Sequence, residues 1–133
     1  MTNSISGNRM FLNWAFVAIF VCVLVLSSFK IVDPNASTRA TVESILLAES
    51  TPEKKLEELE PYIAIGEHIS AVHSRIAPEP KEEFHIDRPT EHAYGLRDSN
   101  LVLAIRANGT IAGIGRHKHG TDDGTVWLAQ PKW

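Results

Sequence analysis

Residues 10 to 29 read MFLNWAFVAIFVCVLVLSSF, a run of twenty residues without a charged side chain. A helix of this length rises about 30 Å, at roughly 1.5 Å per residue, which matches the hydrocarbon core of a bilayer. Such a helix satisfies its own backbone hydrogen bonds and is therefore stable in lipid. The rest of the chain is more polar and holds no second run of this kind. The sequence predicts one transmembrane helix over residues 10–30, after a short tail at residues 1–9.

A secretory signal peptide begins in the same way, with a basic residue such as Arg9 before an apolar run. The apolar core of a signal is shorter, about 7 to 15 residues, and leads to a small-x-small cleavage site, which residues 27–30 do not offer cleanly. We therefore predict an uncleaved signal-anchor and keep cleavage as the alternative. The short tail and the longer acidic domain favour an N-in orientation with the C-terminal domain extracytoplasmic, which is periplasmic for a bacterial inner membrane.

Residues 31–76 carry helical signals. Ser37 or Thr38 is predicted to cap a helix that runs to about residue 49. Thr51 suits the N-cap of a second helix, and Pro52 suits its first position, because proline lacks the N–H that would be unpaired there. This second helix runs to about residue 60, and its acids and lysines are predicted to form a solvated charged face.

An apolar stripe follows, with spacings of 3, 4, 3 and 4 that place its members on one side of a helix. One interpretation is that the stripe packs on the protein's own sheet. The other is that it binds a partner helix or forms a short self-associating coil, although two heptads are too few for a stable coiled coil. The residues of this stripe are Tyr62, Ile65, Ile69, Val72 and Ile76.

The last third of the chain changes character twice. Residues 77–100 are rich in proline and charge and predict a linker, whereas residues 101–133 predict a β-hairpin or meander around Asn108-Gly109, a strong turn signal. The predicted strands cover residues 101–107, 110–115 and 125–130. The predicted fold class is therefore a single N-terminal transmembrane α-helix followed by a small α+β domain, with amphipathic helices and a short C-terminal antiparallel β-meander.

The formal charge of −3 is unevenly distributed. Residues 43–91 hold twelve acids against five bases, whereas the flanking regions are slightly basic. Nucleic-acid binding needs clustered lysine and arginine that displace counterions. The acidic centre of the chain therefore argues against a nucleic-acid partner.

The most site-like stretch is the histidine loop, residues 116–123. Imidazole and carboxylate groups are normal ligands for zinc, copper or nickel. However, Arg116 and Lys118 are interleaved with the histidines and would repel a cation, so a polar hairpin loop explains the same residues. The candidate metal ligands are His117, His119, Asp122 and Asp123. The chain has no strong catalytic motif, and we predict neither an enzyme nor a cofactor.

These observations lead to a functional hypothesis. We expect a bitopic accessory or scaffold subunit of a larger membrane complex, which docks through its helix and through an extracytoplasmic interaction domain. Its expected partners are membrane lipid and other integral membrane proteins, with self-association as an alternative. The candidate partner-binding residues are Asn13 and Trp14, at the entry of the predicted membrane helix, and the apolar stripe. A membrane-tethered module that binds a metal or ligand is a further alternative.

The layout also resembles the ExbD/TolR biopolymer-transport subunits, which have a short tail, one membrane helix and a small periplasmic domain. Phe11-Leu12-Asn13 before the apolar run is similar to the helix entry of that family. The resemblance covers about the first thirty residues and implies an energy-transduction subunit. That family uses an essential membrane carboxylate, and the matching position here is Asn13, which cannot carry a proton. Membership is therefore not inferred.

Overall fold

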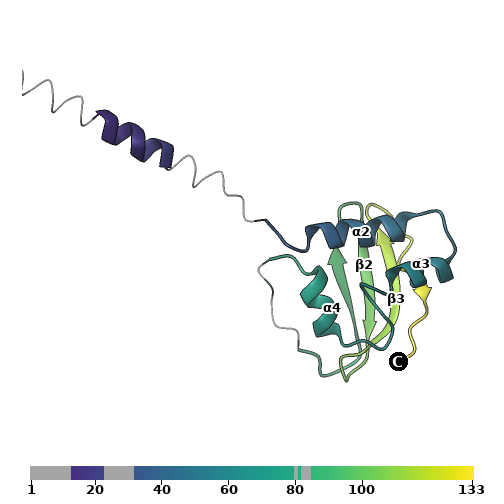
Figure 1. The fold of residues 1–133 in the computed structure, drawn as a ribbon. Helices are drawn as coiled ribbons and strands as arrows, with labels where there is room; N and C mark the ends of the chain where they lie inside the picture. Colours follow the sequence, from purple (N-terminus) through teal and green to yellow (C-terminus); the bar gives the residue numbers. More distant parts are fainter. Residues whose placement is uncertain (1–12, 23–31, 80, 82–84) are drawn as a thin grey trace, which may run out of the picture. The chain divides into compact units, whose positions relative to one another are not determined.

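The computed structural model describes residues 13–22, 32–79, 81 and 85–133 (Figure 1). The chain divides into two compact units, Met1–Val32 and Asp33–Trp133. In the first unit, residues 13–22 form a helix whose side chains are all exposed. The second unit holds the remaining described helices and all the described strands.

The structure does not support the predicted membrane anchor. Within the described residues, no helix combines the length and the apolar character that a membrane crossing needs. Within the predicted span the structure describes residues 13–22, and these are helical. Residues 10–12 and 23–30 of the predicted span lie outside the described residues.

This finding contradicts the transmembrane helix over residues 10–30. It also contradicts the signal-anchor, the single-pass membrane location and the extracytoplasmic placement that were built on that helix. The resemblance in layout to ExbD/TolR depends on the same helix, so it supports no further argument.

The second unit is a two-layer arrangement of helices on a sheet (Figure 1). Its helices are α2 (Ala36–Leu47), α3 (Pro52–Leu59) and α4 (Ile69–Ile76). Its strands are β1 (Thr90–Gly95), β2 (Ser99–Ile105), β3 (Ile111–Lys118) and β4 (Val126–Ala129). The strands form one antiparallel sheet in chain order, β1-β2-β3-β4.

A local hydrogen bond marks the start of α3, whereas the start of α2 is held by a long-range one. The Thr51 hydroxyl accepts from the backbone N–H of Lys54, and Pro52 takes the first position of α3, so the predicted start of this helix is confirmed. Helix α2 begins one residue before Ser37, and no side chain caps it at Asn35. The Asn35 amide instead donates to the Ala77 carbonyl at 2.9 Å, which fastens the start of α2 to the end of α4.

The hydrophobic core lies between the helices and one face of the sheet. Leu101, Leu103 and Ile105 alternate along β2, so all three point to the helix layer. They pack in one cluster with buried side chains of the helices and of the loop after α3: Val42, Leu46, Leu59, Ile63, Ile69, Val72 and Ile76. This continuous cluster is what holds the helices on the sheet.

Strand β1 lies inside the segment predicted as a linker at residues 77–100. It pairs with β2 from Thr90↔Ile105 to Gly95↔Asn100. The sequence signal is weak because this edge strand turns a histidine, His92, toward the helices beside the buried Tyr94. Polar residues at inward positions hide the alternation on which strand prediction depends.

Two glycines of β3 allow the C-terminal segment to approach closely. A Cβ on Gly113 would lie 2.9 Å from the Cα of Pro131, and a Cβ on Gly115 would lie 2.9 Å from the Trp127 ring. Both positions therefore need glycine because backbone or ring atoms occupy the space of a side chain. The segment from Trp127 to Pro131 lies directly on β3 as a result.

Candidate functional site

The predicted apolar stripe divides into buried and exposed members. Ile69, Val72 and Ile76 are fully buried in the core cluster, where they pack on the protein's own helices and sheet. Tyr62 is half-buried. Ile65 is different, because 47% of its surface is exposed. Within the stripe, Ile65 is the side chain most accessible to a partner.

Asn13 and Trp14 belong to the first unit and are exposed on the helix over residues 13–22, Trp14 with 72% of its surface. Their contact with a partner stays a prediction.

The histidine loop does not form one ligand set. The Nδ1 atom of His117 lies 3.0 Å from the Gly124 carbonyl, and the Nε2 atom of His119 lies 2.9 Å from the Asn100 side-chain oxygen. Asp122 and Asp123 are exposed on the loop. In the part of the chain that the structure describes, no three histidine, cysteine or acidic side chains are placed to hold a metal ion.

An apolar groove with an acidic rim lies beside α3, and we call it the α3 groove. Its volume is about 330 Å³. Ile63 and Ile114 are buried at its floor, Leu56 and Ala64 are half-buried in its walls, and Ile65 is exposed at its edge. Glu57 and Glu60 line the same groove and are exposed. The groove thus combines an accessible aliphatic surface with two carboxylates.

The nearby lysines of α3 do not neutralise this rim. Lys55 is only 7% exposed and donates from Nζ to the Leu46 carbonyl at 2.9 Å, near the end of α2. Burial and the charge of Arg116 lower the pKa of Lys55. Lys54 pairs with Glu58 at 3.9 Å. Among the described residues, neither Glu57 nor Glu60 has an ion-pair partner.

The loop that presents Ile65 is fixed on both sides. Arg75 of α4 donates to the Tyr62 carbonyl at 2.8 Å and pairs with Glu67, whose carboxylate also accepts from the Ala64 N–H at 3.3 Å. Because Arg75 stabilises its charged form, Glu67 has a lowered pKa.

Backbone bonds complete the frame of this loop. The N–H of Gly66 donates to the carbonyl of Ile111 at 2.8 Å, and the N–H of Ile111 donates to the carbonyl of Glu67 at 2.9 Å. Ile65 is therefore held in its exposed position by bonds to α4 and β3. A binding residue whose backbone is already fixed loses less conformational entropy when a partner associates.

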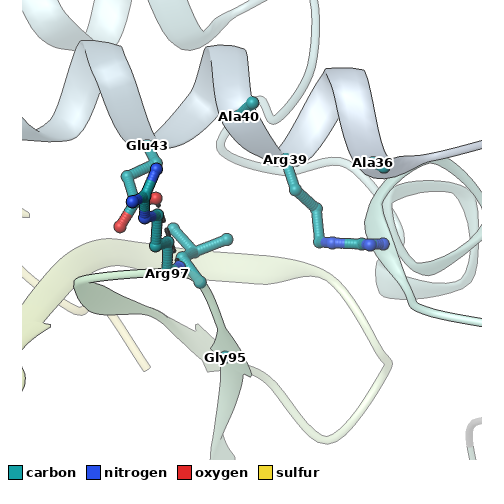
Figure 2. Close-up of a pocket in the computed structure, with 7 residues that line it drawn as sticks. Ala36, Arg39, Ala40, Glu43, Gly95 and Arg97 are labelled. Atoms are coloured by element: carbon teal, nitrogen blue, oxygen red, sulfur yellow. Dashed lines mark hydrogen bonds between the residues drawn. The ribbon is translucent and has the colours of Figure 1, made fainter.

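A second hollow, of about 340 Å³, lies between α2 and the β1–β2 turn (Figure 2). Its charged groups are engaged within the domain. The Glu43 carboxylate accepts from the backbone N–H groups of Arg97 at 3.2 Å and Asp98 at 2.7 Å, and from the Ser99 hydroxyl at 3.3 Å. Arg39 pairs with Asp33 and donates to the Ile76 carbonyl. These groups hold elements together, so we assign this hollow a structural role.

A cluster of two imidazoles and a phenol lies between α4 and β1. The Nδ1 atom of His73 is 2.9 Å from the Tyr94 hydroxyl, and the ring centroids of His92 and Tyr94 are 4.6 Å apart. Burial, and secondarily the charge of His73, lowers the pKa of His92. Burial also raises the pKa of Tyr94. At neutral pH the cluster is therefore uncharged at His92 and Tyr94.

We expect the domain to lose stability as the pH falls through about 6.5, the ordinary pKa of histidine. Because the folded state lowers the pKa of His92, the unfolded chain binds more protons there, and stability rises with pH in this range. Urea unfolding between about pH 7.5 and about pH 5.5 measures the slope. His92→Gln should flatten it and the exposed control His119→Gln should keep it. An unchanged slope in His92→Gln would contradict this assignment.

Sequence reasoning missed the α3 groove because its parts come from α3, the loop after it and β3. Ile65 was recognised within the apolar stripe, whereas Glu57 and Glu60 were assigned to a solvated helix face, where they do lie. The signal in the sequence was a pair of acids, Glu57 and Glu60, followed after the end of a predicted helix by the aliphatic Ile65. That signal is common in sequences and becomes specific only when the fold joins its parts.

Comparisons of the chain with protein-family models, with curated proteins and with solved structures find no match.

Proposed function

We propose that the Asp33–Trp133 unit is a protein-interaction domain and that the protein acts as an accessory or scaffold subunit of a larger assembly. The observation that supports this proposal is the α3 groove, where Ile65 is exposed in a fixed position beside an aliphatic floor. Exposing the Ile65 side chain to water does not stabilise the fold of the domain. Binding a partner would bury this side chain.

The chemistry of the remaining polar groups also favours binding over catalysis. Glu43 and Lys55 are the buried charged side chains among the described residues, and both hydrogen-bond to backbone groups and so stabilise the fold. In the hollow beside Glu43, the Glu43 carboxylate bonds to the Asp98 N–H and Arg39 pairs with Asp33, so both charged groups are engaged within the domain. The domain thus offers a better contact surface than a reaction site.

The scale of the groove sets the expected affinity. Full burial of an isoleucine side chain contributes about 1.5 to 3 kcal/mol, and about half of Ile65 is already covered. Its remaining surface therefore contributes roughly 1 kcal/mol in a complex, to which the groove walls add. A contact of this size suits a modest, reversible association supported by other surfaces of the assembly.

Site-specific photo-crosslinking tests this function. A benzoylphenylalanine at position 65 of the full-length protein, expressed in its native cells, should give one adduct of defined mass. The same group at Asp122, exposed on the histidine loop, serves as the control.

Mass spectrometry then identifies the adduct, and calorimetry with the purified partner compares the wild type with Ile65→Asp. We expect binding to weaken by about tenfold in the variant, because a charge replaces the apolar contact. Identical adducts at positions 65 and 122, or no adduct at position 65, would contradict the proposal. So would an identified partner that binds Ile65→Asp as tightly as the wild type.

A further inference from the structure

We infer that the α3 groove binds a cationic segment of a partner protein that carries an aliphatic anchor. This inference rests on the proposed interaction function and names the chemistry of the partner. It depends on two properties of the groove, the aliphatic floor and the unpaired acidic rim.

The lining of the α3 groove favours an aliphatic side chain as the anchor of the partner. Leu56, Ile63 and Ile114 present only hydrocarbon to the groove, together with Ala64 and the exposed Ile65. A polar side chain placed there would lose its water without gaining a hydrogen bond from these groups, which is unfavourable. A volume of about 330 Å³ is near the lower end of the range for ligand pockets, roughly 300 to 1,000 Å³. One or two aliphatic side chains fit this description best.

The acidic rim of the groove favours a positively charged partner segment. Glu57 and Glu60 are three positions apart at the end of α3, and side chains three apart on a helix are neighbours. Two unpaired carboxylates at this separation repel each other and attract cations. Lysine or arginine residues next to the anchor would pair with both of them while the anchor enters the groove.

The cations of the domain itself leave this position open. Lys55 points to the end of α2, and Arg75 is held by Glu67 and the Tyr62 carbonyl. Lys54 is adjacent in sequence but pairs with Glu58 at 3.9 Å. In the described part of the chain, no cation forms an ion pair with Glu57 or Glu60, and a partner would supply one. A second copy of this chain is a poorer fit, since its own surface is acidic over residues 43–91.

Calorimetry on the full-length protein with short synthetic peptides tests the inference. The probe is an amidated peptide that alternates leucine and lysine pairs. One matched peptide replaces the lysines with glutamates, and another replaces the leucines with serines. The protein variants are Glu57→Lys combined with Glu60→Lys in the groove, and Glu53→Lys combined with Glu58→Lys on the same helix outside it. Both pairs of substitutions change the net charge equally.

We expect the leucine–lysine peptide to bind the wild type and to lose about tenfold in affinity with the groove pair. The control pair should change the affinity by less than about twofold. Serine in place of leucine should also cost about tenfold, because the anchor is lost. The groove pair should gain affinity for the glutamate peptide, which a loss of folding could not produce.

Several outcomes would overturn the inference. They are equal losses in both lysine pairs, equal binding of the serine peptide, and preference of the wild type for the glutamate peptide. Self-association of the free protein that the groove pair abolishes would identify a second copy as the occupant instead. If position 65 crosslinks a partner while no cationic peptide binds, the interaction function stands and the assigned chemistry is wrong.

Discussion

Val72→Asp is expected to unfold the second unit. Val72 lies on α4 with no exposed surface, inside the cluster that joins the helices to the sheet. A buried carboxylate there has no partner, and such substitutions cost about 4 kcal/mol or more. Most domains of this size are stable by only about 5 to 15 kcal/mol. Urea unfolding followed by circular dichroism should show a large loss of stability or no folded state.

Ile65→Asp is the matched control for this experiment, because it makes the same kind of change in the same apolar stripe at an exposed position. We expect its free energy of unfolding to stay within about 1 kcal/mol of the wild type. Together the two variants separate core positions from contact positions. If Val72→Asp folds normally and loses only partner binding, then Val72 is a contact residue and its position in the core is wrong.

Glu43→Ala is expected to lower the free energy of unfolding by about 3 kcal/mol. Glu43 is 9% exposed, and its carboxylate accepts three hydrogen bonds from the β1–β2 turn and the start of β2. Hydrogen bonds to a charged group contribute about 1.5 to 3 kcal/mol each, and water replaces part of them after truncation. Amide exchange at Arg97 and Asp98 should accelerate in the variant, because these N–H groups lose their acceptor.

Glu43→Gln tests the role of the second carboxylate oxygen. The amide keeps one acceptor but presents an NH₂ group to one of the two backbone donors, so an intermediate loss is expected. Glu49→Ala, at an exposed acid shortly after α2, should change stability by less than about 0.5 kcal/mol. A Glu43→Ala variant as stable as Glu49→Ala would show that the turn does not depend on this acid.

Local signals were sufficient for the elements that depend on local chemistry. Thr51 and Pro52 determine the start of α3 through one hydrogen bond and one missing N–H. Asn108-Gly109 correctly predicts a turn between β2 and β3, although only Gly109 has a positive φ, of 84°. The turn closes with the Gly109 N–H donating to the Arg106 carbonyl at 2.8 Å.

Long-range contacts were not predictable from the sequence. Glu43 and Lys55 both look like ordinary residues of charged helix faces, yet both are buried because their partners are backbone groups of other elements. The α3 groove depends in the same way on Ile114, which is far from α3 in the sequence. Nothing in the local pattern of α3 distinguishes Lys55, which points inward, from Lys54, which points outward.

The apolar run at residues 10–29 led to the largest error. Hydropathy records which residue types tolerate lipid, and a membrane crossing also requires a continuous helix of about 20 residues. Among the described residues, no helix meets that requirement.

The position of Glu43 has a consequence for how the chain closes on itself. Sheet neighbours follow one another in sequence, so pairing Ile105 with Ile111 closes a loop of only six residues. The bond from Asp98 to Glu43 closes one of 55 residues. The entropy of loop closure grows with the logarithm of length, so the longer loop costs about 2 kcal/mol more. The junction of α2 with the β1–β2 turn is therefore costly to close, and the Glu43 carboxylate offsets this cost together with the packing of Val42 and Leu46 in the core.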